Sequence, residues 1–592
     1  MNGAALARKR RHGHPCAQST CALLVLVSSW LLPVTAARGQ VIPLVGRGEG
    51  ADVVLVRDDW LVYEPLTLAE ILERVPGIVV SRRGSLGSRL FLQVAGSANG
   101  RVRLAVDGIV YDQPELAWAR LVDVPVAAIE RVEVHRFTDP ARVEVWTRQS
   151  PARAPVTEIE LGRGGLETRT RRVQLQTPRR AWWASGRYDE VLQGVHDFRS
   201  NRLGSQAAEI GTFNGRNRGF EVGFGRPDDE SLRYRFEEFV DNTHGSASSQ
   251  GDSEGSRRVL NALRWSRGVG ASRWTLETSY QAWHRRRSAS IVGGDVDESR
   301  GAVALDVDLP YGSGHRHSLR LRANDHEARS ESAFTQFQIY DVELQTQRRA
   351  SATWNAWLGM HRHERFGNQW SARVHARWEK TAWAWETQAG RGMSFAGWAD
   401  GTATSGERTG LFASLALVRA RPRSTLRLAT FAKDLEHQST APQIFFPSLG
   451  RGPRRVAGTT LQADWTLVGG GLGATGLGTS LTWLPWVQGE RSGQPRVQLE
   501  LRASWTRLDL FEGDLVVALQ SAWRFETRRP FTSAVTLPAE ATGDVQVHLR
   551  VLRRMLFFWN VLNVADVRYE SQPGVRMPER RSLYGVRVQL IN

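Results

Sequence analysis

Two His-Arg-His triplets have the residue types and spacing that could bind a metal ion. They are His315-Arg316-His317 and His361-Arg362-His363. On a strand, residues i and i+2 face the same side, so both imidazoles of a triplet could reach one ion. Asp295, Asp297 and Glu298 form an acidic run that offers the oxygen ligands calcium prefers. Polar histidines at strand ends and an exposed acidic loop are the simpler interpretation, and we predict no metal site.

The polar segment of residues 241–258 contains the parts of a hydrolase site. Asp241, His244 and Ser246 lie close together in it and could act as Ser-His or Asp-His catalytic groups. Proximity in a polar loop does not fix the geometry that catalysis requires. We therefore predict that the protein is not an enzyme.

Residues 471–476 (GLGATG) satisfy the dinucleotide-binding pattern G-x-G-x-x-G. That pattern needs a strand before it and a helix after it within a βαβ unit. Here Leu481-Thr482-Trp483 follows and is typical of another strand. A glycine-rich hairpin turn is the prediction, with no bound cofactor.

The N-terminus has the order of a secretory signal peptide. Basic residues 8–11 precede an apolar run from Cys21 to Val34, and small residues follow it. We expect cleavage after Ala36 or Ala37, so that residues 1–37 are removed; an uncleaved anchor is the alternative. Both cysteines of the chain lie in this segment, which excludes disulfides, Cys-zinc sites and cysteine nucleophiles from the mature protein.

The formal net charge of +17 resembles that of a nucleic-acid-binding protein, but a secreted chain argues against a nucleic-acid partner. Only Lys9, Lys380 and Lys433 are lysines, and arginines are spread along the whole chain. A codon bias is the simplest explanation. An arginine-lined lumen that attracts anionic solutes or lipopolysaccharide phosphates is the alternative.

Alternating strands fill the chain from residue 149 onward. Trp370, Ala372, Val374, Ala376 and Trp378 share one face, and polar residues occupy the other. The end tryptophans are eight residues apart, or ~26 Å, close to the ~25 Å apolar band of an outer-membrane barrel. Similar alternation recurs near residues 274–282, 497–505, 515–525 and 545–551. Since the other face is charged rather than apolar, it suits a wet lumen better than a second packed sheet.

Residues 149–592 are therefore predicted to form a large antiparallel transmembrane β-barrel. At ~20 residues for each strand with its loop share, about 22 strands fit, and about 16 to 20 strands with longer loops are the alternative. Short turns at residues 379–382 and 419–424 should be periplasmic. Long connections at residues 241–258 and 441–458 should be extracellular.

Residues 66–148 are typical of a small α/β domain. An amphipathic segment ends in Pro76 and Gly77, Gly96 follows one short strand, and Asp107 and Gly108 follow another. The segment then reaches a strand that contains Ile129, Glu130, Val132, Glu133 and Val134. This order resembles the plug domain of TonB-dependent outer-membrane receptors. The resemblance implies a mostly β fold in which the plug lies inside the barrel lumen and closes it.

The two ends of the mature chain resemble the same family. Within the lead of residues 38–65, Asp52, Val53, Val54, Leu55 and Val56 are similar to the energy-transducing TonB box, and an ordinary plug strand is the alternative that we favour. Near the C-terminus, Gly585, Val588 and Leu590 resemble the signal read by the barrel-assembly machinery. The family usually ends on an aromatic residue, whereas this chain ends on Asn592.

The resemblance implies a receptor in the outer membrane of a Gram-negative bacterium, in contact with its lipid and expected to be a monomer. It would import a small-molecule ligand of the siderophore, cobalamin, saccharide or peptide class, with energy delivered through TonB, ExbB and ExbD. A passive or structural plugged porin without TonB coupling is the alternative. Two departures bear on this: Ala95 precedes Gly96 where the family has arginine, and the glycine-rich loop expected after Val134 is missing. We expect a shortened plug that seals or moves differently.

Overall fold

The computed structural model describes most of the chain from residue 51 onward. The described residues are 51–61, 63–82, 86, 90–97, 102–113, 118–119, 121–148, 154–178, 181–197, 210–225, 230–245, 252–288, 296–312, 314–330, 334–349, 352–364, 367–395, 407–435, 455–468, 473–488, 494–510, 515–530, 536–552, 554–572 and 575–591. The predicted signal peptide lies outside them.

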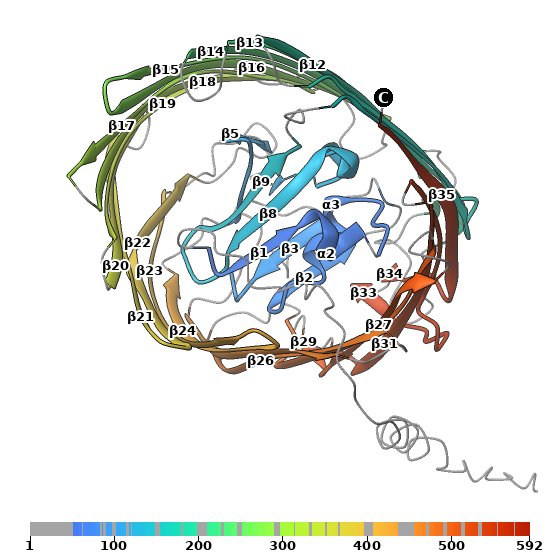
Figure 1. Cartoon of the computed structure of the whole chain (residues 1–592). Coiled ribbons are helices and arrows are strands. Elements are labelled where there is room, and N and C mark those ends of the chain that lie inside the picture. Colours follow the sequence, from blue (N-terminus) through green and yellow to red (C-terminus); the bar gives the residue numbers. More distant parts are fainter. Residues whose placement is uncertain are drawn as a thin grey trace, which may run out of the picture.

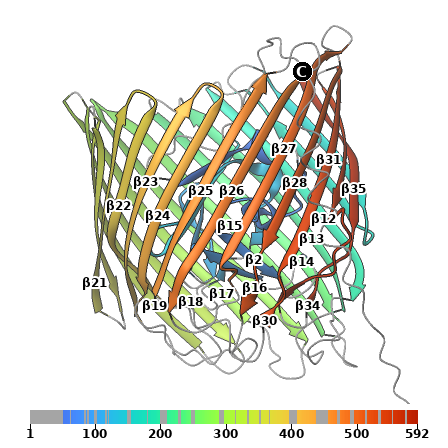
Figure 2. The same cartoon turned by 90° about the horizontal axis from the view of Figure 1, so that it is seen from below.

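A closed antiparallel barrel of 22 strands surrounds a small N-terminal domain, which confirms the predicted fold (Figure 1). Its strands are β10 (Val156–Gly164), β11 (Arg169–Gln176), β12 (Trp182–Asp197), β13 (Ile210–Gly225), β14 (Glu230–Gly245), β15 (Asp252–Val269), β16 (Ser272–Ser288), β17 (Val296–Tyr311), β18 (His315–Ser330), β19 (Phe334–Arg349), β20 (Ala352–His363), β21 (Gly367–Lys380), β22 (Trp383–Phe395), β23 (Glu407–Arg421), β24 (Ser424–Leu435), β25 (Arg455–Val468), β26 (Ala474–Gln488), β27 (Val497–Leu510), β28 (Leu515–Glu526), β31 (Glu540–Val551), β32 (Met555–Leu562) and β35 (Arg581–Ile591). Figure 2 shows their common tilt, which closure of a barrel requires.

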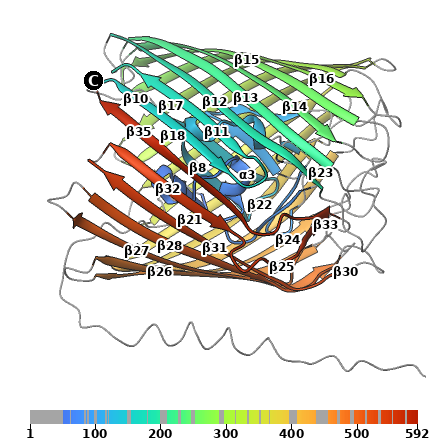
Figure 3. The same cartoon turned by 90° about the vertical axis from the view of Figure 1, so that its right-hand side faces the viewer.

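The first and last strands close the barrel. β10 pairs antiparallel with β35, with Val156 opposite Ile591. At the end of the barrel where Val156 and Ile591 lie, the turns between strands are short. Two examples are the turns between β21 and β22 and between β23 and β24, and both of these short turns were predicted. The opposite end carries the hairpins β29 (Arg529–Pro530) with β30 (Thr536–Leu537) and β33 (Glu570–Gln572) with β34 (Val575–Arg576) (Figure 3).

The prediction of a long loop at residues 241–258 is wrong. β14 continues to Gly245 and β15 already begins at Asp252, so most of this polar stretch forms paired strands. The reason is physical: polar residues are compatible with strands whose faces meet water or a wet lumen. The barrel is therefore tall with compact connections here. The other predicted long loop, at residues 441–458, lies mostly outside the described residues.

The two faces of the wall differ as the alternation predicted. Trp370, Val374 and Trp378 of β21 point outward and are 50%, 53% and 48% exposed. His375, between them on the other face, is buried in the lumen. Apolar side chains with tryptophans at both ends of a strand match the outer band and aromatic girdles of a membrane barrel.

The N-terminal domain lies inside the barrel. Its five-stranded sheet has the order β1-β8-β9-β4-β5, from β1 (Val53–Val56), β8 (Ile129–His135), β9 (Ala141–Thr147), β4 (Val102–Val106) and β5 (Ile109–Val110). Small elements complete it: α2 (Arg57–Leu61), α3 (Leu68–Leu72), β2 (Ile78–Arg82), β3 (Leu90–Val94), β6 (Asp112–Gln113), β7 (Trp118–Ala119), η2 (Leu121–Asp123) and η3 (Val126–Ala128). Because β1 belongs to this sheet, the domain includes residues before Leu66, which the sequence division placed in the lead. No helix of the described residues is long and apolar enough to span a bilayer.

An apolar core holds this domain together and extends to the barrel wall. Ile129, Val132 and Val134 of β8 are fully buried in it. Leu260 and Ala262, on the lumenal face of β15, join the same cluster. Burial of a large aliphatic side chain contributes about 1.5–3 kcal/mol, so these contacts fix the domain against one side of the lumen.

Candidate functional site: the plug and its contacts with the barrel wall

The Asp107-Gly108 turn is a tight two-residue hairpin loop between β4 and β5. Asp107 and Gly108 both have positive φ, 52° and 87°, as a type I′ turn requires. The Asp107 carboxylate also accepts hydrogen bonds from the backbone N–H of Thr147 (2.8 Å) and from its hydroxyl (2.5 Å). The turn therefore ties the start of β5 to the end of β9.

The same aspartate joins the plug to the wall. Its carboxylate pairs with Arg235 and lies 3.6 Å from the guanidinium of Arg233, both on β14. The Arg264 guanidinium donates to the Asp107 carbonyl at 2.7 Å. Burial by itself would raise the pKa of Asp107, but the two guanidinium groups and the Thr147 hydrogen bonds hold this pKa well below its ordinary value. Asp107 is thus a charged anchor.

A second motif turn, Ala95-Gly96, follows β3. Both residues have positive φ, 44° and 87°, and Val94 and Ser97 form the flanking bridge. A side chain on Gly96 would collide with Val456 of the wall, so glycine is required by close approach as well as by φ. Ala95, where the family has arginine, adopts the left-handed region without glycine's freedom.

Lys433 of β24 clamps this turn. Its ammonium donates to the Ser97 hydroxyl at 2.8 Å and to the Arg136 carbonyl at 2.6 Å. The Pro76-Gly77 turn is held nearby, because the Arg136 guanidinium donates to the Pro76 carbonyl at 2.7 Å. Burial lowers the pKa of Arg136 to about 10. Sequence reasoning missed Lys433, although it is one of only three lysines in an arginine-rich chain.

Further ion pairs connect the helical side of the plug to the wall near the barrel seam. Arg57 lies 2.6 Å from Glu158, and Arg74 lies 2.5 Å from Asp544. Glu64 contacts Arg587 of β35, which also binds Glu160 at 2.7 Å. Burial raises the pKa of Glu64 to about 8, and Arg587 opposes this rise only in part because Glu160 shares it.

The turn of residues 136–140, where the sequence comparison led us to expect a longer glycine-rich loop, packs directly on the wall. Phe137 stacks on Phe431 of β24, with ring centroids 4.9 Å apart. It is 1% exposed and also belongs to a cluster with Val456 and Leu484. The short connection between β8 and β9 is therefore held to the wall by buried apolar contacts.

The candidate TonB box is a strand of the plug. Val53 to Val56 pair with β8, with Val53 opposite Val134 and Val56 opposite Arg131. Val53, Val54 and Leu55 are buried, and the Asp52 carboxylate accepts a hydrogen bond from the backbone N–H of Phe137 at 3.1 Å. This placement fits the alternative of an ordinary plug strand. In this conformation Asp52 to Leu55 are buried, and Val56 is exposed.

The barrel-assembly residues lie in the closing strand β35. Leu590 is exposed on the outer face of the barrel, and Val588, two residues before it on the strand, points to the same face. Gly585 leaves room for the ring of Phe558 and for the Leu161 carbonyl, both of which would clash with a side chain there. The glycine of this segment therefore has a packing reason at the seam.

A cavity of about 820 Å³ separates one face of the plug from the wall. Its wall residues lie near the strand ends that are joined by short turns, as in Arg273 of β16 and Arg320 of β18. Of the described residues, eight arginines and seven carboxylates line it. The charges nearly cancel, so this cavity does not support the alternative of an arginine-lined lumen that attracts anions.

Several of the sequence candidates for metal binding or hydrolysis contact other groups instead. The ring of His361 contacts Asp341 (2.7 Å) and Ser371 (2.9 Å) through its two nitrogens, while His363 stacks on Phe337. Asp297 and Glu298 alternate on β17, so they face opposite sides. Asp241 is buried and accepts a hydrogen bond from the backbone N–H of Ser256 at 3.1 Å; Asp295 and Ser246 lie outside the described residues.

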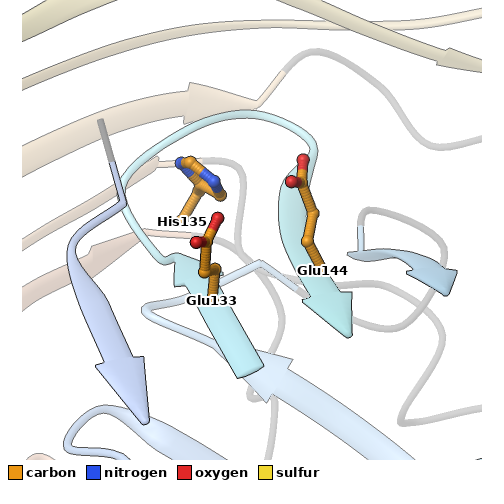
Figure 4. Close-up of side chains that lie close together, drawn as sticks. All are labelled: Glu133, His135 and Glu144. Carbon is orange, nitrogen blue, oxygen red and sulfur yellow. The ribbon is translucent and has the colours of Figure 1, made fainter. Parts of the chain in front are cut away.

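One possible metal-binding group does occur among the described residues, on the plug rather than on the wall. Glu133, His135 and Glu144 place their ligand atoms within 4.8 Å of one another, and all three line the cavity (Figure 4). Glu133 belongs to the plug motif, whereas His135 and Glu144 were not singled out in the sequence. The pattern that could have indicated them in the sequence is Glu-x-His on one predicted strand, followed by a glutamate on the next strand.

These features define a transmembrane barrel closed by a folded plug. Residues 52–145 match the family model described as the TonB-dependent Receptor Plug Domain. The chain is thus a plug-domain-plus-barrel protein with the fold of TonB-dependent receptors. No curated protein matches the sequence.

Solved structures share this fold at low sequence identity. A ferric enterobactin receptor from Pseudomonas aeruginosa is 12% identical with a TM-score of 0.74, and the match covers 92% of this chain and 98% of that one. The FrpB iron transporter from Neisseria meningitidis is 11% identical with a TM-score of 0.74, covering 91% and 100%. The ferric yersiniabactin uptake receptor from Yersinia pestis is 13% identical with a TM-score of 0.69, covering 92% and 98%.

Proposed function

We propose that the protein is an outer-membrane receptor of a Gram-negative bacterium that imports a scarce solute through its plugged barrel by TonB-coupled gating. The observation that carries this proposal is a folded plug held inside a closed barrel. A solute of siderophore size must displace or remodel such a plug in order to pass. Energy for this step would come from TonB with ExbB and ExbD.

The polar character of the plug–wall contacts supports the proposal that the plug moves relative to the barrel. Many of them are ion pairs and hydrogen bonds, such as Arg74 with Asp544 and Lys433 with Ser97. Polar interfaces within a chain can exchange their contacts for water at lower cost than apolar cores, and relative motion is expected of them. The apolar contacts of the plug with Leu260 and Ala262 of β15 and with Phe431 of β24 should then need the greatest force to separate.

Ferric siderophores are the first substrate class to test, since similar structures include receptors for ferric enterobactin and ferric yersiniabactin. Uptake of ⁵⁵Fe-enterobactin, ⁵⁵Fe-yersiniabactin and ⁵⁷Co-cobalamin should be measured in cells that express the protein, with the TonB system intact or deleted. We expect one probe to accumulate only when TonB is present. Equal accumulation without TonB would contradict coupled import.

A plugged porin without TonB coupling is the second candidate. The observation that favours it is the burial of Asp52 and of Val53 to Leu55 in the plug, where Val53 to Val56 already pair with β8. This candidate predicts slow, TonB-independent passage of small solutes. Liposome swelling with sugars of increasing size distinguishes the two, because a coupled receptor stays closed in this assay.

A further inference from the structure

The plug carries two glutamates and a histidine that converge from adjacent strands. Glu133 and His135 are at i and i+2 on β8, so their side chains share a face, and Glu144 lies directly opposite Glu133 on β9. Their ligand atoms lie within 4.8 Å of one another at the edge of the cavity. We propose that Glu133, His135 and Glu144 bind one divalent transition-metal ion on the lumenal face of the plug.

The strand register supplies an independent reason for a cation. Carboxylates placed directly opposite each other on paired strands repel, and burial strengthens this repulsion. Glu133 is 8% exposed. The Arg131 guanidinium lies 3.1 Å from Glu133, but its side chain is 42% exposed, and exposed ion pairs contribute little. A divalent ion between the two carboxylates would neutralise both charges and remove the repulsion.

The donor set selects the class of ion. One imidazole nitrogen and two carboxylate oxygens suit Zn²⁺, Fe²⁺, Co²⁺ or Mn²⁺. Calcium prefers six to eight oxygen ligands, which three side chains do not provide. Soft ions prefer thiolates, and the chain has no cysteine after Cys21. The remaining coordination positions would face the cavity and be filled by water.

The position of the site gives the ion a structural consequence. β8 and β9 flank the turn of residues 136–140, which stands in place of the longer loop. An ion held by both strands would crosslink them and stabilise this part of the plug, since a ligand that binds only the folded state stabilises that state. Arg142 and Arg373 line the same cavity, so we expect weaker affinity than at a closed structural zinc site.

The test uses the full-length protein, purified in detergent and stripped with a chelator. Co²⁺ titration followed by visible absorption should give one ion per chain, with Zn²⁺ competing for it. Glu144→Gln and His135→Gln should each weaken binding at least tenfold. His284→Gln is the matched control, because His284 forms an exposed contact with Asp297 at 2.6 Å on the wall and does not line the cavity; it should bind as the wild type does.

Hydrogen exchange keeps the result interpretable if a variant folds poorly. In the wild type, added Co²⁺ should slow exchange of the β8 and β9 amides, whereas in a folded Glu144→Gln variant it should not. The absence of stoichiometric binding to the wild type would overturn the proposal. Unchanged affinity in both site variants would also overturn it. Neither outcome depends on TonB-coupled import, since binding is measured on the isolated protein.

Discussion

Asp107→Asn should loosen the plug without altering its shape. The substitution keeps the size of the side chain, and the amide oxygen can still accept the hydrogen bond from the backbone N–H of Thr147. What it removes is the negative charge that faces Arg235 and Arg233. Both arginines belong to the wall, so the loss affects the docking of the plug in particular.

The free energy lost in Asp107→Asn depends on which carboxylate partners Arg235 and Arg233 keep. Removal of one member of a buried ion pair typically costs about 3–5 kcal/mol, because the other charge is left uncompensated. Here Arg235 keeps Glu237, and Arg233 keeps Glu221 at 2.5 Å. We therefore expect about 2–3 kcal/mol, a factor of about 30 to 150 in the opening equilibrium.

Hydrogen exchange at pH 7 measures this opening, because amides of a locally unfolding unit report its free energy. The β4 and β9 amides of Asp107→Asn should exchange about 30 to 150 times faster than in the wild type. Asp308→Asn is the control, since Asp308 pairs with the exposed Arg316 at 2.6 Å within the wall. A change below threefold in Asp107→Asn, or an equal change in the control, would refute the reasoning.

Three further predictions concern other parts of the molecule. Deletion of residues 38–148 should convert a closed barrel into a high-conductance pore in planar bilayers, and unchanged conductance would contradict the plug assignment. Gly585→Val should slow or reduce barrel closure, because overpacking at the seam against Phe558 costs about 1–3 kcal/mol. The fraction of heat-modifiable barrel on semi-native gels measures it, with Leu428→Val on the exposed outer face of β24 as the control. Glu64→Gln should flatten the pH dependence of plug stability: the pKa of Glu64 is raised from 4.5 to about 8, so its contribution is fully present below about pH 4.5 and is lost as pH rises through 8. The melting temperatures of the variant and the wild type should be measured across this pH range. An equal dependence of melting temperature on pH in both proteins would contradict the prediction.

Local rules explain how much of the fold could be predicted. The alternation around Val374 and the two end tryptophans of β21 predicted which side faces the membrane, because strand side chains alternate whatever the surroundings. Asp107 and Gly108 were predicted to follow a short strand, and the structure places them in a hairpin turn whose two positive φ angles favour this pair of residues. The prediction of a loop at residues 241–258 was wrong because polar composition cannot distinguish a loop from a strand that borders water.

The candidate site was less predictable, since its members are distant in the chain. Lys433 and Ser97 are 336 residues apart in the chain, and only the packing of the plug inside the barrel brings them into contact. Glu133 and Glu144 come together through strand register, and a shift of one residue would turn Glu144 to the other face of the sheet.

By itself, the sequence predicted a signal peptide that carries both cysteines, and it determined a plug and a barrel of alternating strands, because these depend on local pattern and residue type. Only the tertiary structure decided how the arginines are used. In the lumen many of them face carboxylates from other strands or from the plug, and the cavity of about 820 Å³ between the plug and the wall is close to neutral rather than basic. The tertiary structure also decided that Val53 to Leu55 are buried in the edge strand β1 of the plug sheet, since their burial depends on the elements that pack over that strand.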